Sequence, residues 1–355
     1  MTMSFFESDR LSAAEAIAKA QHIAFAPMVF QASRALRTLG ILDVLYKGTN
    51  VTMPVIIEKT GLSNYGVRVL LEAGLGIGLV TLQDGIYKLT KTGWFILHDK
   101  MTIANMDFSH DVCYEGLATL DEAIVTGTPT GLKAFGEWST IYQGLAYLPE
   151  KATRSWYAFD HFYSDDAYPS VIPMIARHKL RSILDIGGNT GRFALQCLRS
   201  DPDIRVGIVD LPNMANAAAE SINKQGFGDR VSFHPTDMLD PQQSLPVGFD
   251  AVWMSQFLDC FSEAESVAIL NKVRSSISDD AVVFIMEPFW DLQTREVSAF
   301  CLQMTSLYFT GLANGNSQMY NSEVFLRCVG EAGLKVTEQT DNIGVCQTLL
   351  VCKKA

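Results

Sequence analysis

The stretch "LDIGGNTG", Leu184 to Gly191, decides the fold of this chain. It ends the apolar run "SILDIG" and leads into "GRFALQCLRS", whose apolar residues recur at helical spacing. Glycines permit a sharp turn and a close approach of the backbone to a ligand, and a helix N-terminus offers unpaired N–H groups to an anion. The stretch therefore predicts a strand, a ligand-binding turn and a helix. A tight turn with a purely structural purpose is the alternative interpretation.

Strands and helices continue to alternate after this turn. The apolar runs "RVGIVDL", "RVSFHPTD", "FDAVWMSQ" and "AVVFIMEP" are separated by the helical patterns "MANAAAESINKQG" and "AESVAILNKVRSSI". A helix, "NSEVFLRCVGEAG", and two strands, "KVTEQTDN" and "CQTLLVCKK", close the chain. This alternation predicts an α/β fold with a doubly wound, Rossmann-like sheet over residues 181–355, whose site lies at the carboxyl ends of the strands.

The first part of the chain has a different pattern. "MVFQASRALRTLGILDVL" carries apolar residues at helical spacing, Leu36 and Leu39 among them. Two shorter helices follow, the second with Ser63 as its N-cap, and "LVTLQDGIYKLT" predicts a hairpin around Asp84 and Gly85. Helix, turn, helix and hairpin predict a mostly α-helical, winged-helix-like domain over residues 1–105. Residues 106–180, rich in aromatic side chains, are predicted to form a connecting helical segment.

A winged-helix pattern is typical of DNA-binding proteins, so DNA binding has to be considered. The presumed recognition helix, residues 64–73, carries a single basic side chain, Arg68, beside Glu72. A DNA reader needs a basic surface for phosphates, and the net charge of −11 also argues against a nucleic-acid partner. A folding and dimerisation module is therefore the favoured interpretation.

Composition excludes further classes of protein. No apolar run is long enough for a membrane span, and the acidic N-terminus does not resemble a secretory signal. Seven cysteines without a CxxC pair fit reduced thiols in a cytoplasmic protein. The six histidines show no metal-ligand spacing, so we expect no metal.

Three carboxylates sharpen the interpretation of the glycine-rich turn. Asp185 precedes Gly187 in the strand end, and the spacing is G-x-N-x-G rather than GxGxxG. Asp210 closes the next strand, where a carboxylate can accept hydrogen bonds from ribose hydroxyls. In "HPTDM", Asp237 can accept from an adenine amine and Met238 can pack on its face.

"ILDIGGNTG", "VDLP", "PTDM" and "FLDCFSEAE", in this order, resemble the S-adenosylmethionine (SAM)-dependent methyltransferases of the caffeic-acid and hydroxyindole O-methyltransferase type. The resemblance covers nearly the whole chain. "ALRTLGILDVL" is similar to the family's dimerising helix, and "WYAFDHFYSDDA" to the helix that lines its acceptor pocket. The resemblance implies SAM as cofactor and a homodimer formed through the N-terminal domain. By position it assigns cofactor contacts to Asp185, Gly187, Gly188, Gly191, Asp210, Leu211, Asp237, Met238 and Ser255, the last where the family usually has a lysine.

The catalytic segment departs from the family pattern. Members usually carry a histidine base in an "LHDWSDE" segment, oriented by two glutamates. Here Asp259 stands at the histidine position, Glu287 matches the first glutamate, and the second falls on Met319 or Tyr320. Three explanations stay open: Asp259 is the base, another histidine such as His161 or His110 serves, or the acceptor is nucleophilic enough without a base. Asp259 as a helix N-cap is the structural alternative.

The resemblance also implies a hydrophobic acceptor pocket. Phe300, Met304, Tyr308 and Phe309 recur at helical spacing where the family has the back wall of its pocket, although such a stripe is also typical of a core. The pocket residues that we expect are Phe159, Phe162, Tyr163, Met304, Tyr308 and Met319.

We therefore expect a SAM-dependent methyltransferase that acts on a small aromatic molecule, by O-methylation as the default and with C-methylation open. The alternative from another class is a non-catalytic SAM-binding or regulatory protein derived from a methyltransferase. A dehydrogenase is a third option, against which the Asp185 spacing and "PTDM" argue.

Overall fold

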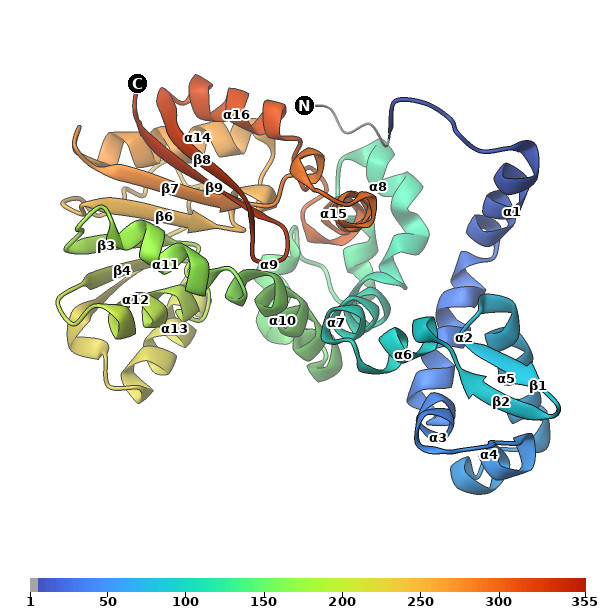
Figure 1. Cartoon of the computed structure of the whole chain (residues 1–355). Coiled ribbons are helices and arrows are strands. Elements are labelled where there is room, and N and C mark those ends of the chain that lie inside the picture. Colours follow the sequence, from blue (N-terminus) through green and yellow to red (C-terminus); the bar gives the residue numbers. More distant parts are fainter. Residues whose placement is uncertain (1–5) are drawn as a thin grey trace. The chain divides into compact units, whose positions relative to one another are not determined.

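The computed structural model describes residues 6–355 (Figure 1). Residues 6–110 form one compact unit and residues 111–355 another. Within the described residues no helix is both long and apolar enough to cross a membrane, and no group of three histidine, cysteine or acidic side chains is placed to hold a metal ion.

The first unit is helical with one hairpin, as predicted. Its core is built on Leu36, Ile41 and Leu71, which are fully buried. Its elements are α1 (Ala13–Ala24), α2 (Ala26–Thr38), α3 (Ile41–Lys47), α4 (Met53–Thr60), α5 (Asn64–Ile77), β1 (Val80–Gln83), β2 (Ile86–Leu89), α6 (Lys91–His98) and α7 (Lys100–Phe108).

Two local features of this unit follow directly from its residue types. Ser63 caps α5 by accepting a hydrogen bond from the Gly66 N–H. Asp84 and Gly85 both have positive φ, 52° and 77°. Positive φ at both central residues gives the two-residue turn whose twist matches that of the paired strands β1 and β2. The expected long helix through Leu39 is wrong in one respect, because left-handed Gly40 ends α2 and leaves Leu39 exposed.

The second unit is the doubly wound domain. Its seven-stranded sheet has the order β5-β4-β3-β6-β7-β9-β8, parallel except at β9, which runs antiparallel to both of its neighbours. The strands are β3 (Ser182–Ile186), β4 (Arg205–Asp210), β5 (Val231–Pro235), β6 (Ala251–Ser255), β7 (Val282–Glu287), β8 (Leu334–Ile343) and β9 (Gln347–Lys354). The helices are α8 (Leu120–Thr126), α9 (Ile141–Gly144), α10 (Glu150–Asp165), α11 (Tyr168–Ala176), α12 (Arg192–Ser200), α13 (Pro212–Lys224), α14 (Glu263–Ser276), α15 (Glu296–Tyr308) and α16 (Ser322–Glu331).

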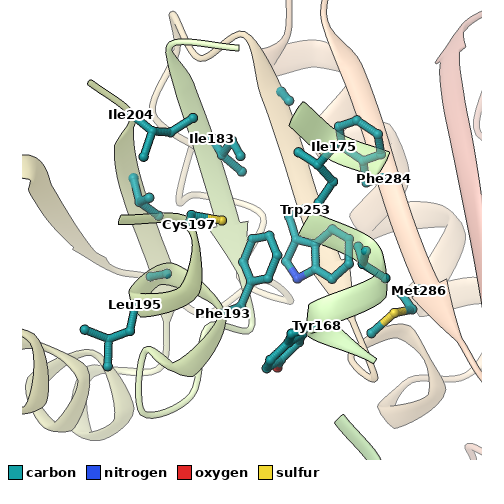
Figure 2. Close-up of a cluster of buried hydrophobic side chains, with 14 of the residues drawn as sticks. Tyr168, Ile175, Ile183, Phe193, Leu195, Cys197, Ile204, Trp253, Phe284 and Met286 are labelled. Atoms are coloured by element: carbon teal, nitrogen blue, oxygen red, sulfur yellow. The ribbon is translucent and has the colours of Figure 1, made fainter. Parts of the chain in front are cut away.

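Alternate side chains of the parallel strands supply two cores, one on each face of the sheet. On one face Phe193 of α12 stacks on Trp253 of β6 with ring centroids 4.2 Å apart, and Figure 2 shows Tyr168 and Phe284 in the same cluster. Side chains from α14 and α16 cover the other face. Because both faces are covered, the central strands β3, β6 and β7 are buried and mostly apolar, and polar groups gather where these strands end.

Candidate functional site

The glycine-rich turn joins the end of β3 to the start of α12. Gly187, Asn189 and Gly191 all have left-handed backbones, with φ of 75°, 49° and 78°. A Cβ atom on Gly187 would overlap the ring of Phe257, so this position combines a positive φ with a close approach. Asparagine tolerates the left-handed conformation better than most residues, which accounts for Asn189 within the turn.

Two carboxyl groups meet at this turn. Asp210, at the end of β4, accepts the Asn189 N–H through Oδ2 at 2.8 Å and the Leu211 N–H through Oδ1 at 2.7 Å. Burial raises the pKa of Asp210 to about 6, although those two hydrogen bonds oppose the shift. Burial and the charge of Asp210 raise the pKa of Asp185 to about 8. A ligand that brings hydrogen-bond donors or positive charge would stabilise the ionised form of both carboxyl groups.

Buried polar atoms without partners line a cavity beside the turn. Asp185 Oδ2, Asn189 Oδ1, Ser255 Oγ and Gln256 Nε2 are enclosed and make no hydrogen bond, and all four residues line this cavity. Enclosed polar groups without partners are costly, so their arrangement indicates a polar ligand. Acceptors and a donor in one cavity fit the ammonium and carboxylate of the methionine end of SAM.

The predicted adenine-side residues lie in the loop after β5. Asp237 is exposed, its Oδ1 accepts the Leu239 N–H at 2.9 Å, and its own N–H donates to Gln243 Oε1. Met238 is buried, and its carbonyl oxygen accepts a hydrogen bond from Lys272 Nζ at 2.9 Å. Their contact with adenine, like that of Leu211 with ribose, stays a prediction.

Asp259 lies in a short 3₁₀ turn, Leu258–Cys260, after β6 and is only 3% exposed. Glu287, from the end of β7, accepts the Phe257 and Leu258 N–H groups through Oε1 at 3.0 and 2.8 Å. Glu287 therefore holds the backbone of the turn that presents Asp259. The N-cap alternative for Asp259 is wrong, because Ser262 caps α14.

The environment of Asp259 is strongly unfavourable to charge. Burial raises the pKa of its carboxyl to about 7, and burial together with the charge of Asp259 raises the pKa of Glu287 as well. The Cys260 thiol donates to Asp259 Oδ1 at 3.4 Å, which is a weak hydrogen bond. A carboxyl group with a pKa near neutrality can accept and release a proton at the pH of a cell.

His161 lies on α10 and lines the same cavity as the glycine-rich turn. Burial, and then the charge of Arg192, lower the pKa of its imidazole to about 4, so the ring is neutral near pH 7. Its ring stacks on Tyr157 with centroids 5.7 Å apart, and its Nδ1 lies 3.6 Å from Asp160 Oδ2. His110 belongs to the other compact unit.

Two polar residues near the site escaped the sequence analysis. Asp160 Oδ2 accepts a hydrogen bond from Asn189 Nδ2 at 3.1 Å, which ties α10 to the glycine-rich turn. Tyr142, on α9, has an enclosed hydroxyl group. Burial raises the pKa of this hydroxyl, and the charges of Cys260 and Asp259 raise it further. Asp160 could have been predicted, because it is next to His161 in the helix expected to line the pocket. No feature of the sequence pointed to Tyr142.

The predicted acceptor residues fall into two groups. Phe159, Phe162 and Tyr163 form an aromatic cluster on α10, with Phe159–Tyr163 centroids 4.9 Å apart. The Tyr308 hydroxyl accepts a hydrogen bond from Trp156 Nε1 at 2.8 Å in a buried position, and Met319 is buried too.

The helix that carries Tyr308 does not bury all of the predicted stripe. On α15 Phe300 is 54% and Met304 45% exposed, because the helix buries Ala299 and Leu302 instead. Tyr320 donates its hydroxyl to the Phe261 carbonyl at 2.6 Å. It therefore braces the loop after Asp259.

We predict that Glu287→Ala destabilises the protein by about 2–3 kcal/mol, because two buried N–H groups lose their acceptor. Glu287→Gln keeps an amide oxygen for those groups and should cost clearly less. Urea unfolding of both variants measures the difference, and equal losses would show that the Glu287 carboxyl does not hold the turn through these hydrogen bonds.

Two family models match the chain. Residues 18–87 match the Dimerisation2-like domain and residues 167–334 match the O-methyltransferase domain. Among curated relatives, the L-tyrosine C(3)-methyltransferase of Streptomyces lavendulae is 24% identical over 321 residues, covering 88% of this chain and 85% of the relative. The 3-hydroxy-5-methyl-1-naphthoate 3-O-methyltransferase of Streptomyces sahachiroi is 25% identical over 252 residues, covering 70% of each.

Solved structures share the fold over almost the whole chain. The mitomycin 7-O-methyltransferase MmcR superposes with a TM-score of 0.74 at 18% identity, covering 96% of this chain and 98% of that one. The SAM-dependent methyltransferase SibL gives 0.73 at 22% identity, covering 95% and 99%. The two domain matches stand in the expected order, so the chain carries a Dimerisation2-like domain followed by an O-methyltransferase domain.

Proposed function

We propose that the protein transfers a methyl group from SAM to a small aromatic acceptor, with O-methylation as the default. The observation that carries the proposal is the cavity of unpartnered polar atoms at the ends of β3 and β6. Asp259 and Glu287 are buried at the ends of β6 and β7 and do not line this cavity. SAM supplies an electrophilic methyl group when it is bound there. Asp185, Asn189, Ser255 and Gln256 would bind its methionine end, and Asp210 its ribose.

Proton removal is the step that we assign to the altered segment. A hydroxyl on the acceptor transfers its proton to an Asp259 carboxylate oxygen, and the enclosed site excludes the water that would compete for it. Glu287 fixes the turn that holds Asp259. His161, neutral and at the cavity wall, is the second candidate for the base, and an acceptor that needs no base is the third.

Transfer to a ring carbon is supported as a second possibility by one relative, the L-tyrosine C(3)-methyltransferase. Ring-carbon attack and oxygen attack need the same cofactor geometry and differ in the atom placed in line with the methyl group. Mass spectrometry of a labelled product distinguishes them, because an aryl methyl ether is cleaved by acid and a ring methyl is not.

The direct test of the proposal is isothermal titration with SAM and with its demethylated product, S-adenosylhomocysteine (SAH). Binding of both, followed by transfer of label from SAM to a phenol, a thiol or a compound in cell extract, supports an enzyme. No binding of either would overturn the proposal. Tight binding without turnover on any acceptor would favour the non-catalytic SAM-binding alternative.

We predict a homodimer through the N-terminal domain. Helix α1 buries none of its residues in its own chain, and Ile17, Ile23, Phe25 and Met28 are each more than half exposed. Such a surface needs a partner, and a second copy is the partner that the Dimerisation2-like match favours. Light scattering should give twice the mass of 39.1 kDa, and Ile17→Asp with Ile23→Asp should give the monomer. A wild-type monomer would contradict this prediction.

A further inference from the structure

The loop after β5, residues 236–243, carries the two residues that are predicted to contact adenine, Asp237 and Met238. It forms neither a helix nor a strand. The Thr236 N–H donates to the Asp210 carbonyl oxygen at 2.8 Å, which fixes the start of the loop beside the end of β4. Beyond this point the shape of the loop depends on side chains rather than on regular backbone pairing.

Side chains within the loop hold part of its backbone. The Asp237 N–H donates to Gln243 Oε1 at 2.9 Å, and Gln243 Nε2 donates to Asp240 Oδ2 at 2.9 Å. The Asp240 N–H donates in turn to the Asp237 carbonyl oxygen at 3.2 Å. These three hydrogen bonds close a ring, so a shift of Asp240 also moves Asp237. Asp237 Oδ1 accepts the Leu239 N–H, and Oδ2 is left for an adenine amine.

Lys272, on α14, holds the same loop from outside. Its Nζ donates to the Met238 carbonyl oxygen at 2.9 Å and to the Asp240 carbonyl oxygen at 2.7 Å. The Met238 side chain is buried in the same core cluster as Ile269 and Val273 of α14, which brings the loop within reach of Lys272. The loop is therefore fixed to the helix by one apolar side chain and one ammonium group.

The contacts of this ammonium group are unusual for a lysine. Lysine generally keeps its charge in water or beside an acid, and ordering its long side chain costs conformational entropy. Among the described residues Lys272 forms no ion pair, and neutral carbonyl groups accept its hydrogen bonds. The two carbonyl groups flank Leu239, which is 45% exposed at the tip of the loop. One cation therefore fixes the loop on both sides of its tip.

We infer that Lys272 is a positioning residue for the adenine side of the cofactor site, and that it determines how well the protein distinguishes adenine from another base. This inference rests on the proposed function. With Lys272 in place, Asp237 is held where its carboxylate can accept a hydrogen bond from the adenine amine. Without it, the Met238 and Asp240 carbonyl groups lose a charged donor, and the Asp237 carboxylate no longer has one fixed position.

Two ligands that differ at one position of the base test the inference. They are SAH and S-inosylhomocysteine, which carries an oxygen where adenine carries its amine. Each is titrated by calorimetry into the full-length protein at neutral pH. We expect the wild type to bind SAH at least about tenfold more tightly, because that oxygen cannot donate to the Asp237 carboxylate and is repelled by its charge.

Variants of Lys272 identify the source of this preference. Lys272→Met removes both hydrogen bonds and should lower the ratio of the SAH affinity to the S-inosylhomocysteine affinity by at least about threefold, mostly through weaker SAH binding. Lys272→Arg keeps a cation with several N–H donors, so its ratio should stay within about twofold of the wild-type ratio. Lys335→Met removes an exposed lysine on β8, at the sheet edge opposite β5, and should change neither affinity.

The ratio separates positioning from a merely structural role, because a variant that only destabilises the fold affects both ligands alike. An unchanged ratio in Lys272→Met overturns the inference, and so does a lowered ratio in both Lys272→Met and Lys272→Arg. If Lys272→Met does not fold, the neutral Lys272→Gln takes its place, with the same lowered ratio expected and the same meaning for an unchanged one.

The wild-type titrations separate this inference from the proposed function. Equal affinities of the wild type for the two ligands overturn the inference and leave the methyltransferase function standing. Failure of SAH itself to bind the wild type overturns the proposed function.

Discussion

Replacing Asp210 with alanine is expected to weaken SAH binding by about 100-fold or more. The carboxylate accepts hydrogen bonds from the backbone N–H groups of Asn189, in the glycine-rich turn, and of Leu211. It therefore shapes the turn in addition to its predicted role in binding ribose. Loss of these charge-assisted bonds, together with the ribose contacts, amounts to roughly 3 kcal/mol, which corresponds to about two orders of magnitude in Kd. Titration calorimetry measures it.

Two variants make this result specific. Asp203→Ala removes an exposed aspartate just before the same strand and should leave the SAH affinity unchanged. Asp259→Ala removes a carboxyl on the acceptor side and should weaken SAH binding far less than Asp210→Ala does. Equal losses in Asp210→Ala and Asp259→Ala would show that the division into a cofactor side and an acceptor side is wrong.

The order of the elements was open to prediction because local signals coincide with the tertiary fold. "LDIGGNTG" has glycine at two positions with left-handed backbone, and Asp84 and Gly85 occupy two further left-handed positions in the hairpin turn. Ser63 is a residue type that caps helices, and it caps α5. The central parallel strands are runs of mostly apolar residues, which separates them from the amphipathic helices between them. Each of these signals is contained in a few consecutive residues.

The acceptor side was less predictable because its residues meet only through tertiary contacts. Tyr142 and Asp160 lie on α9 and α10, far in the chain from Asp259, and no residue spacing links them to it. Helical periodicity alone could not show that α15 leaves Phe300 and Met304 exposed. Periodicity identifies the residues that share one face of a helix, but it does not show which element packs against that face. Asp259 and Ser262 are both plausible caps in sequence, and only the capping box of Ser262 with Glu265 decides between them.

Replacing Asp259 with asparagine is expected to lower kcat by at least about 100-fold, the usual contribution of a general base, while SAH binding persists. In the wild type the rate should rise as the pH passes through about 7, because the Asp259 carboxyl must be ionised to accept a proton. Asparagine cannot titrate, so the variant's residual rate should lose this dependence. A variant with a wild-type rate and pH profile would assign the base to His161, or to no residue.

The same substitution should make the protein more stable, which distinguishes the loss of a base from a loss of fold. Because folding raises the pKa of Asp259 to about 7, its carboxyl contributes no penalty at pH values below its unfolded pKa of about 4, and stability is lost as the pH rises toward about 7. At a pH of about 8 the buried charge costs roughly 2–4 kcal/mol, which asparagine removes. Urea unfolding should therefore show Asp259→Asn more stable than the wild type at high pH, with the difference shrinking toward pH values of about 4. An inactive variant that is also less stable at every pH would mean that Asp259 acts through structure. A gain in stability together with a loss of rate would mean that the buried Asp259 carboxyl lowers the stability of the protein and is needed for its chemistry.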